Sequence, residues 1–262
     1  MVVIKKNIVY DQTFDLKTDI YFPTETDRQT KILILWHGGS WLRGSKDAEK
    51  GLAVRLANAG FMTLVPDYRL APAALFPAAH QDCVHFVQWL LASKYTDAED
   101  EKNISQLGIS CGGTMAIYVA GQYGFPTVTW SAPVSFSNRV SDSVKPALQP
   151  REELGLTDKK EIQASFYKNF VLNYAPTRQL QEELDVENYD LSKLGQLLML
   201  NSAHELTPLS DVLAFAKKLA DRGRELNLLL IPGDRHGRHY SSDYIDESID
   251  FLKRSGSRPQ AH

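Results

Sequence analysis

Cysteine is scarce in this sequence: only Cys83 and Cys111 occur among 262 residues. Two thiols cannot build a dense disulfide framework, and neither lies in a CxxC or Cys/His pattern that would predict zinc. Long apolar runs are also lacking, since the longest, 32–36, is far below the roughly 20 residues that a membrane span needs. The first ten residues do not resemble a secretory signal, so we expect a cytoplasmic protein with reduced thiols.

Excess charge of either sign is absent as well. There are 29 basic and 32 acidic residues, for a net charge of −3. This balance gives no reason to expect nucleic acid or an anionic membrane as a partner. Hydrophobic residues make up 43% and charged residues 23%, which excludes a collagen, a mucin-like stalk or a largely disordered chain.

Strand-like and helix-like patterns alternate along most of the chain. Two loosely alternating segments, 2–10 and 17–22, predict an antiparallel strand pair. Continuous apolar runs predict six buried strands at 31–36, 61–66, 104–109, 127–130, 197–200 and 226–231. Helical spacing of apolar residues predicts helices at 46–59, 78–94, 111–123, 209–222 and 243–253. The sequence therefore predicts an α/β fold with a mostly parallel central sheet of about eight strands, an antiparallel first hairpin and helices on both faces.

One polar segment, 137–191, interrupts this alternation. It lacks a buried-strand run and predicts two short helices at 159–172 and 177–184. We interpret it as a small helical cap inserted above the strand ends, although an ordinary helical excursion without a role in binding is the alternative. The predicted parts are a core, a cap insertion and a frayed tail, at residues 1–136 with 192–255, 137–191 and 256–262.

The segment Gly108-Ile109-Ser110-Cys111-Gly112 fits the pattern G-x-S-x-G between a predicted strand and a predicted helix. A serine in this context occupies a sharp, strained turn that holds its Oγ above the sheet. The helix N-terminus adds unpaired N–H groups and the positive end of a dipole. Ser110 is therefore the candidate nucleophile, and the alternative is a serine N-cap with glycines for close packing.

Two consecutive glycines, Gly38 and Gly39, follow the predicted strand at 31–36. Such a pair lets the backbone turn its N–H groups toward one point, where they could stabilise an oxyanion together with the N–H of Cys111. Alone, these glycines would be interpreted as a turn beside a buried His37. The serine pattern further along the chain favours the oxyanion hole.

Four short motifs together resemble the hormone-sensitive-lipase-like esterases of the α/β-hydrolase fold. They are HGGSW at 37–41, DYRLAP at 67–72, FPAA at 76–79 and GISCGG at 108–113. The resemblance extends over most of residues 30–255. The chain departs from the family where Ser40 replaces the third glycine of HGGG, and where GISCGG replaces GDSAGG. Neither departure removes a catalytic atom.

The resemblance also implies the position of the general base. In the family, the catalytic histidine lies in a P-G-x-x-H-G segment after the last strand, and Pro232–Gly237 matches that pattern. His236 would take the proton from Ser110 Oγ and later give one to the leaving alcohol. The nearby His239 is the competing candidate.

The acidic partner of the histidine is the least defined residue. In the order serine, acid, histidine it should follow the predicted strand at 197–200. The two positions where family members carry aspartate hold Thr207 and His204 here. Glu205 and Asp211 remain as candidates, and a serine–histidine pair without a carboxylate is a third alternative.

Helix-start signals separate these two candidates. Thr207-Pro208 predicts an N-cap followed by proline at the first helical position. Asp211 would then lie in the first helical turn, where the helix dipole alone explains an acidic residue. Glu205 lies in the loop, and its extra methylene could compensate for a shifted backbone. We therefore favour Glu205.

These features predict a serine carboxylesterase that hydrolyses small, short-chain acyl esters through an acyl-enzyme intermediate. The predicted catalytic residues are Ser110, His236 and Glu205, and the predicted oxyanion-hole residues are Gly38, Gly39 and Cys111. No metal or organic cofactor is needed, the expected partner is a small-molecule ester, and a homodimer is possible. The alternatives are an amidase-type hydrolase resembling arylformamidases, and a catalytically impaired binding member of the fold.

Three aromatic residues, Trp41, Trp130 and Phe136, could form walls of a substrate pocket, although core packing explains them nearly as well. The thiol of Cys111 has no lysine or arginine beside it in sequence that would depress its pKa. We interpret this side chain as a small apolar filler.

Overall fold

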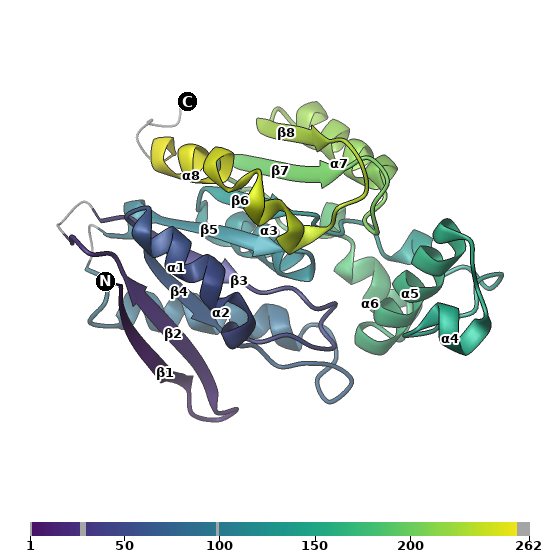
Figure 1. The fold of residues 1–262 in the computed structure, drawn as a ribbon, viewed down its shortest axis with the longest axis horizontal. Helices are drawn as coiled ribbons and strands as arrows, with labels where there is room; N and C mark the ends of the chain where they lie inside the picture. The colour runs from purple at the N-terminus through teal and green to yellow at the C-terminus, as the bar shows by residue number, and fades with distance from the viewer. Residues whose placement is uncertain (1, 27–29, 98–99, 256–262) are drawn as a thin grey trace.

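Eight strands form one mixed sheet in the computed structural model, which describes residues 2–26, 30–97 and 100–255 (Figure 1). Across the sheet their order is β1-β2-β4-β3-β5-β6-β7-β8. The strands are β1 (Val3–Asp11), β2 (Leu16–Phe22), β3 (Ile32–Trp36), β4 (Met62–Pro66), β5 (Ile104–Ile109), β6 (Thr127–Trp130), β7 (Leu197–Ser202) and β8 (Leu226–Ile231). Strand β2 is antiparallel to both its neighbours and all other pairs are parallel, so the predicted α/β sheet is confirmed. The predicted tail, 256–262, lies outside the described residues.

Helices cover both faces of this sheet, as predicted. One face carries α1 (Lys50–Asn58) and α8 (Ile245–Arg254), and the other carries α2 (Ala78–Ala92), α3 (Cys111–Tyr123) and α7 (Leu209–Asp221). Side chains alternate between the two faces along a strand. In β3, Ile34 belongs to the apolar cluster under α2, α3 and α7, whereas Leu35 belongs to the cluster under α1 and α8. A strand buried on both faces needs a mostly apolar run, which explains why these strands could be predicted from the sequence.

The helix predicted at 46–59 begins later than expected because a 3-10 turn takes up its first residues, and the helix predicted at 243–253 begins two residues late, at Ile245. Residues Lys46–Glu49 form a 3-10 turn before α1, and Gly237–Ser242 form another before α8. The backbone N–H of Lys46 donates to Asp67 Oδ1 at 2.7 Å, and its Nζ lies 3.2 Å from Asp19 Oδ1. These contacts join distant parts of the chain, so helical spacing alone could not reveal them.

The segment between β6 and β7 folds into helices that lie beyond the end of the sheet toward which the parallel strands point (Figure 1). They are α4 (Pro150–Leu154), α5 (Lys159–Tyr174) and α6 (Arg178–Leu184). The two predicted helices correspond to α5 and α6, and the five-residue α4 was not predicted. Its shortness left too few apolar positions to show a period. That this insertion, residues 137–191, acts as a cap stays a prediction.

A buried glutamine joins four elements at the centre of the sheet. Gln106 on β5 accepts a hydrogen bond from Trp36 Nε1 on β3 at 2.8 Å. Its own Nε2 donates to the carbonyl of Ala116 on α3 at 2.8 Å and to Thr127 Oγ1 on β6 at 2.9 Å. Gln106 is 0% exposed, so these partners replace the water that its amide loses on burial.

We expect Gln106→Leu to lower the free energy of unfolding by about 1–3 kcal/mol, because it leaves the indole N–H of Trp36 buried without an acceptor. Urea denaturation followed by circular dichroism would measure the change. The matched control is Gln179→Leu at an exposed position of α6, which should change the free energy by less than about 0.5 kcal/mol. Equal effects at the two positions would contradict this account of Gln106.

Candidate active site

Ser110 lies in the sharp turn between β5 and α3. Its φ is +51° and its ψ is −123°, a conformation that residues other than glycine adopt rarely and at a cost. Backbone hydrogen bonds hold the turn: Ser110 N donates to the carbonyl of Trp130 at 2.7 Å, and Gly113 N donates to the carbonyl of Ser110 at 2.7 Å. The residue is 7% exposed. Because it directly follows the last residue of β5, its hydroxyl lies at the carboxyl end of the parallel strands.

His236 follows β8 and lies between two of the other predicted site residues. Its Nε2 is 3.0 Å from Ser110 Oγ, and its Nδ1 is 2.5 Å from Glu205 Oε2. A carboxylate oxygen can only accept, so Nδ1 carries the proton and Nε2 is left to accept from the serine hydroxyl. The imidazole is 27% exposed and the Glu205 side chain is 0% exposed.

The carboxylate of Glu205 is surrounded by hydrogen-bond donors. Its Oε1 accepts from Ser202 N at 2.8 Å, from Ser131 Oγ at 2.9 Å and from Tyr240 OH at 2.8 Å. A buried carboxylate needs such partners, because burial without them would cost several kcal/mol. Burial and the adjacent charge of Glu205 raise the pKa of Tyr240, which keeps its hydroxyl protonated as a donor.

Ser131 and Tyr240, which support the carboxylate, were not among the residues predicted from the sequence. Ser131 directly follows the strand predicted at 127–130, which would have placed it at the same edge of the sheet as Ser110. Tyr240 lies four residues after His236, and nothing in its local pattern signals a contact with a loop some 35 residues away.

Asp211, the competing acid, bonds with Arg139, whereas the described hydrogen bonds of the His236 ring are with Glu205 and Ser110. It is in the first turn of α7, as predicted, and forms an ion pair with Arg139, whose Nε lies 2.8 Å from Asp211 Oδ2. The predicted N-cap role of Thr207 is wrong: Pro208 is the N-cap residue, and no side chain caps the helix. Thr207 Oγ1 instead donates to the carbonyl of Ser131 at 2.9 Å. His239, the competing base, is exposed.

The loop with Gly38 and Gly39 lies against the serine turn. A methyl group added to Gly38 would lie 3.4 Å from Ser110 Cβ. One added to Gly112 would lie 2.4 Å from the carbonyl oxygen of Trp36, so only glycine lets the start of α3 approach the end of β3 this closely. Cys111 is the first residue of α3, and its N–H has no intrahelical acceptor. This arrangement is compatible with the predicted oxyanion hole.

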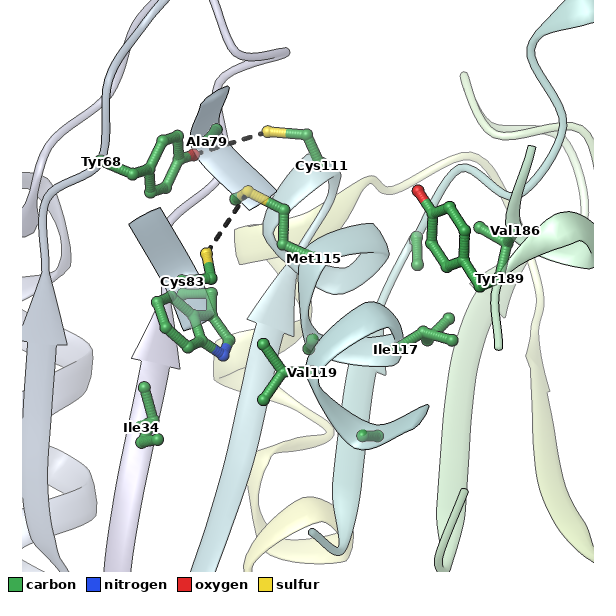
Figure 2. Packing of buried hydrophobic residues seen from close by; sticks show 14 of the residues in the cluster. Ile34, Tyr68, Ala79, Cys83, Cys111, Met115, Ile117, Val119, Val186 and Tyr189 are labelled. Atoms are coloured by element: carbon green, nitrogen blue, oxygen red, sulfur yellow. Dashed lines mark hydrogen bonds between the residues drawn. The ribbon is translucent and has the colours of Figure 1, made fainter. Parts of the chain in front are cut away.

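The sulfur of Cys111 lies within hydrogen-bonding reach of the backbone N–H groups of Ser40 and Trp41 in this loop. The side chain points toward Tyr68 (Figure 2), whose hydroxyl lies 3.7 Å from the sulfur. The same hydroxyl donates to the carbonyl of His37 at 2.8 Å, and the two rings stack with centroids 4.0 Å apart. Burial raises the pKa of the Cys111 thiol. Both cysteines are buried and unpaired, so this thiol packs as an apolar group rather than acting as a nucleophile.

The three aromatic residues suggested as pocket walls are all fully buried. Trp41, Trp130 and Phe136 are each 0% exposed. Trp130 donates from Nε1 to Ser248 Oγ at 3.0 Å, on the face covered by α8. Core packing therefore accounts for their burial.

Within residues 2–26, 30–97 and 100–255, no three His, Cys, Asp or Glu side chains are grouped so that they could hold a metal ion. In the same part of the chain, no helix is long and apolar enough to cross a membrane.

Comparisons with known proteins agree with this architecture. A family model of the alpha/beta hydrolase fold matches residues 33–240. The arylesterase of Saccharolobus solfataricus is 24% identical over 239 residues, which cover 86% of this chain and 73% of that protein. The ethyl acetate hydrolase of Pseudomonas putida is 26% identical over 246 residues, which cover 90% and 76%. A solved esterase from the bacterial hormone-sensitive lipase family has the same fold, with a TM-score of 0.68 at 21% identity over 97% of this chain and 82% of its own. The resemblance inferred from the four motifs is confirmed.

Two buried histidines are held in the neutral form. Burial lowers the pKa of His37 from 6.5 to about 4 and that of His80 from 6.5 to about 3. His37 precedes the glycine loop, and His80 on α2 forms hydrogen bonds with Tyr174 OH at 2.9 Å and Tyr189 OH at 3.0 Å.

We expect the free energy of unfolding to fall as the pH decreases from about 6.5 to about 4. In that interval the unfolded histidines take up protons that the folded protein excludes, so protonation favours the unfolded chain. Each histidine adds a slope of about 1.4 kcal/mol per pH unit. In urea titrations across this range, His80→Gln should lower the slope by about that amount. An unchanged slope would contradict the neutral, buried state of His80.

Proposed function

The chain belongs to the α/β-hydrolase fold family, and on that premise we propose that it is a serine carboxylesterase acting on small, short-chain acyl esters. One observation supports this most directly. Ser110 Oγ, the His236 imidazole and the Glu205 carboxylate are joined in series by contacts of 3.0 and 2.5 Å. The strained serine turn and the adjacent glycine loop add the remaining parts that acyl transfer needs.

In the proposed reaction, Ser110 Oγ attacks the ester carbonyl carbon while His236 Nε2 takes its proton. The N–H groups of Gly38, Gly39 and Cys111 stabilise the oxyanion of the tetrahedral intermediate. The intermediate collapses and expels the alcohol, which receives the proton from His236. Water then attacks the acyl-serine with its proton passing to His236, and the second collapse releases the carboxylic acid and returns the proton to Ser110.

Glu205 has a positioning and electrostatic role in this scheme. Its Oε2 fixes the imidazole with the proton on Nδ1 and stabilises the imidazolium that forms when Ser110 is deprotonated. Its Oε1 is held by three donors, so the carboxylate does not need to reorganise during the reaction.

Short acyl groups are proposed on two grounds. A relative that covers most of this chain is an ethyl acetate hydrolase. The insertion lies beyond the carboxyl ends of the strands, where Ser110 is also found, and Trp41 and Phe136 fill the adjacent interior.

A cytoplasmic location and a homodimer also stay predictions. The outer strand β8 exposes 47% of Leu230, an apolar edge that a second copy could cover.

We expect Ser110→Ala to abolish hydrolysis of p-nitrophenyl acetate and Glu205→Gln to lower kcat by about 10⁴-fold, because the imidazole loses its orientation and its stabilised cation. Asp211→Asn is the matched control: it removes a carboxylate that contacts Arg139, so kcat should stay near that of the wild type. Initial rates on folded variants would decide. A large loss in Asp211→Asn with none in Glu205→Gln would contradict the assignment of the acid.

Substrate class is tested by a panel of p-nitrophenyl esters from acetate to decanoate, set against N-formyl aryl amides. We expect kcat/KM to be highest for acetate or butyrate and to fall for longer chains. Preference for the formyl amides would instead indicate an arylformamidase-type hydrolase. If a folded wild type hydrolyses neither class and is not labelled by a fluorophosphonate, the protein is a non-catalytic member of the fold.

A further inference from the structure

The glycine loop contains an unusual stretch of backbone. Ser40 and Trp41 both have positive φ values, +59° and +58°. A bulky residue such as tryptophan rarely adopts the left-handed region, because its side chain is strained there. Strain of this kind persists only where surrounding contacts impose it. Because these residues follow Gly39 directly, whatever holds them also sets the direction of the neighbouring N–H groups.

Four aromatic rings surround the Trp41 side chain: two come from α5 in the insertion, and two, Phe136 and His80, come from the core. Its indole stacks on the ring of Tyr174, with centroids 4.4 Å apart and planes inclined by 12°. Phe170, one turn earlier on α5, lies 6.1 Å from it, and Phe136 lies 5.7 Å from it. The indole is 0% exposed. The stack therefore fixes the side chain of Trp41 between α5 and the loop.

Tyr174 is itself held by the core. Its hydroxyl lies 2.9 Å from Nδ1 of His80 on α2, and Nε2 of His80 lies 3.0 Å from Tyr189 OH. Its backbone carbonyl accepts from Phe76 N at 2.8 Å. Tyr174 is 0% exposed. The ring that supports Trp41 is thus fixed at its hydroxyl and at its backbone.

We propose that Tyr174 is a positioning residue for the oxyanion hole. By stacking on Trp41, it keeps residues 38–41 in the strained conformation that directs the N–H groups of Gly38 and Gly39 toward the carbonyl oxygen of the substrate. This inference rests on the proposed esterase function. It gives α5 a second role, since the end of this helix is part of the catalytic scaffold.

The test removes the aromatic ring of Tyr174. Tyr174→Leu should lower kcat for p-nitrophenyl acetate about 10- to 100-fold, a fraction of what loss of a whole oxyanion donor costs, while KM changes less than about threefold. Affinity for a trifluoromethyl ketone, which forms an oxyanion in the same site, should fall in parallel. Tyr174→Phe keeps the ring and should restore most of kcat.

Phe86→Leu is the control that distinguishes a positioning role of Tyr174 from a purely structural one. Phe86 is also 0% exposed, and its ring contacts are with Tyr10, Trp36 and Trp89. This variant should lose thermal stability without a comparable loss of kcat. If Tyr174→Leu and Phe86→Leu lower Tm equally and kcat equally, the proposal is wrong. If Tyr174→Leu does not fold, Tyr174→Met replaces the ring with a flexible apolar chain and is judged by the same criteria.

Failure of the Tyr174 proposal can be distinguished from failure of the esterase proposal. A wild type without Ser110-dependent hydrolysis would refute the esterase function, whatever Tyr174 does. The crystal structure of Tyr174→Leu then decides on the loop alone. Relaxation of Ser40 and Trp41 to negative φ would support the positioning role of Tyr174, and an unchanged loop backbone would overturn it.

Discussion

The arrangement of the site depends on one buried carboxylate. Glu205 reaches the interior with 0% of its side chain exposed, and such a charge is tolerated only where hydrogen bonds replace the lost water. Ser131, Ser202 and Tyr240 supply these bonds from three different segments of the chain. Because one oxygen is saturated in this way, the other is directed at His236, and the imidazole is directed in turn at Ser110. The hydrogen bonds that stabilise the buried charge therefore also orient the base.

Backbone strain accompanies this constraint. Among the described residues, the non-glycine positions with positive φ include Ser40, Trp41, Ser110 and Ser131, all of which follow the carboxyl ends of parallel strands. Three of these four have contacts from distant segments: the β6 carbonyl for Ser110, the Thr207 hydroxyl for the backbone of Ser131, and the Tyr174 ring for Trp41. The interior on both faces of the sheet consists mainly of buried apolar side chains. It can therefore stabilise a rim where several residues adopt costly conformations.

The sequence predicted the frame well because the frame is periodic. The segments 104–109 and 226–231 coincide with β5 and β8. Every position of β5 is buried, as expected for an inner parallel strand, whereas β8 is an outer strand with a mostly apolar sequence and partly exposed side chains. Ser110 and His236 could be chosen because motifs at strand ends are local. The residues that hydrogen-bond the acid could not be chosen in this way, because Tyr240 and Ser131 come into contact with Glu205 only in the folded protein. Thr207 was mistaken for an N-cap for the same reason: its hydroxyl serves a contact with Ser131, 76 residues away.

The resemblance to the hormone-sensitive-lipase-like esterases implies aspartate at 207, and the contacts of Thr207 and Glu205 are a physical reason why this chain can carry threonine there. Thr207 and Glu205 both bind Ser131, one through the backbone carbonyl and the other through the hydroxyl. An aspartate at 207 would bring a second carboxylate into this small buried cluster, where like charges repel and one of them would have to take up a proton. A neutral hydroxyl at 207 leaves the donors free for the carboxylate that arrives from 205, whose longer side chain spans the added distance. A neutral hydroxyl at 207 and a carboxylate at 205 are thus compatible in this cluster, because each forms its own hydrogen bond with Ser131.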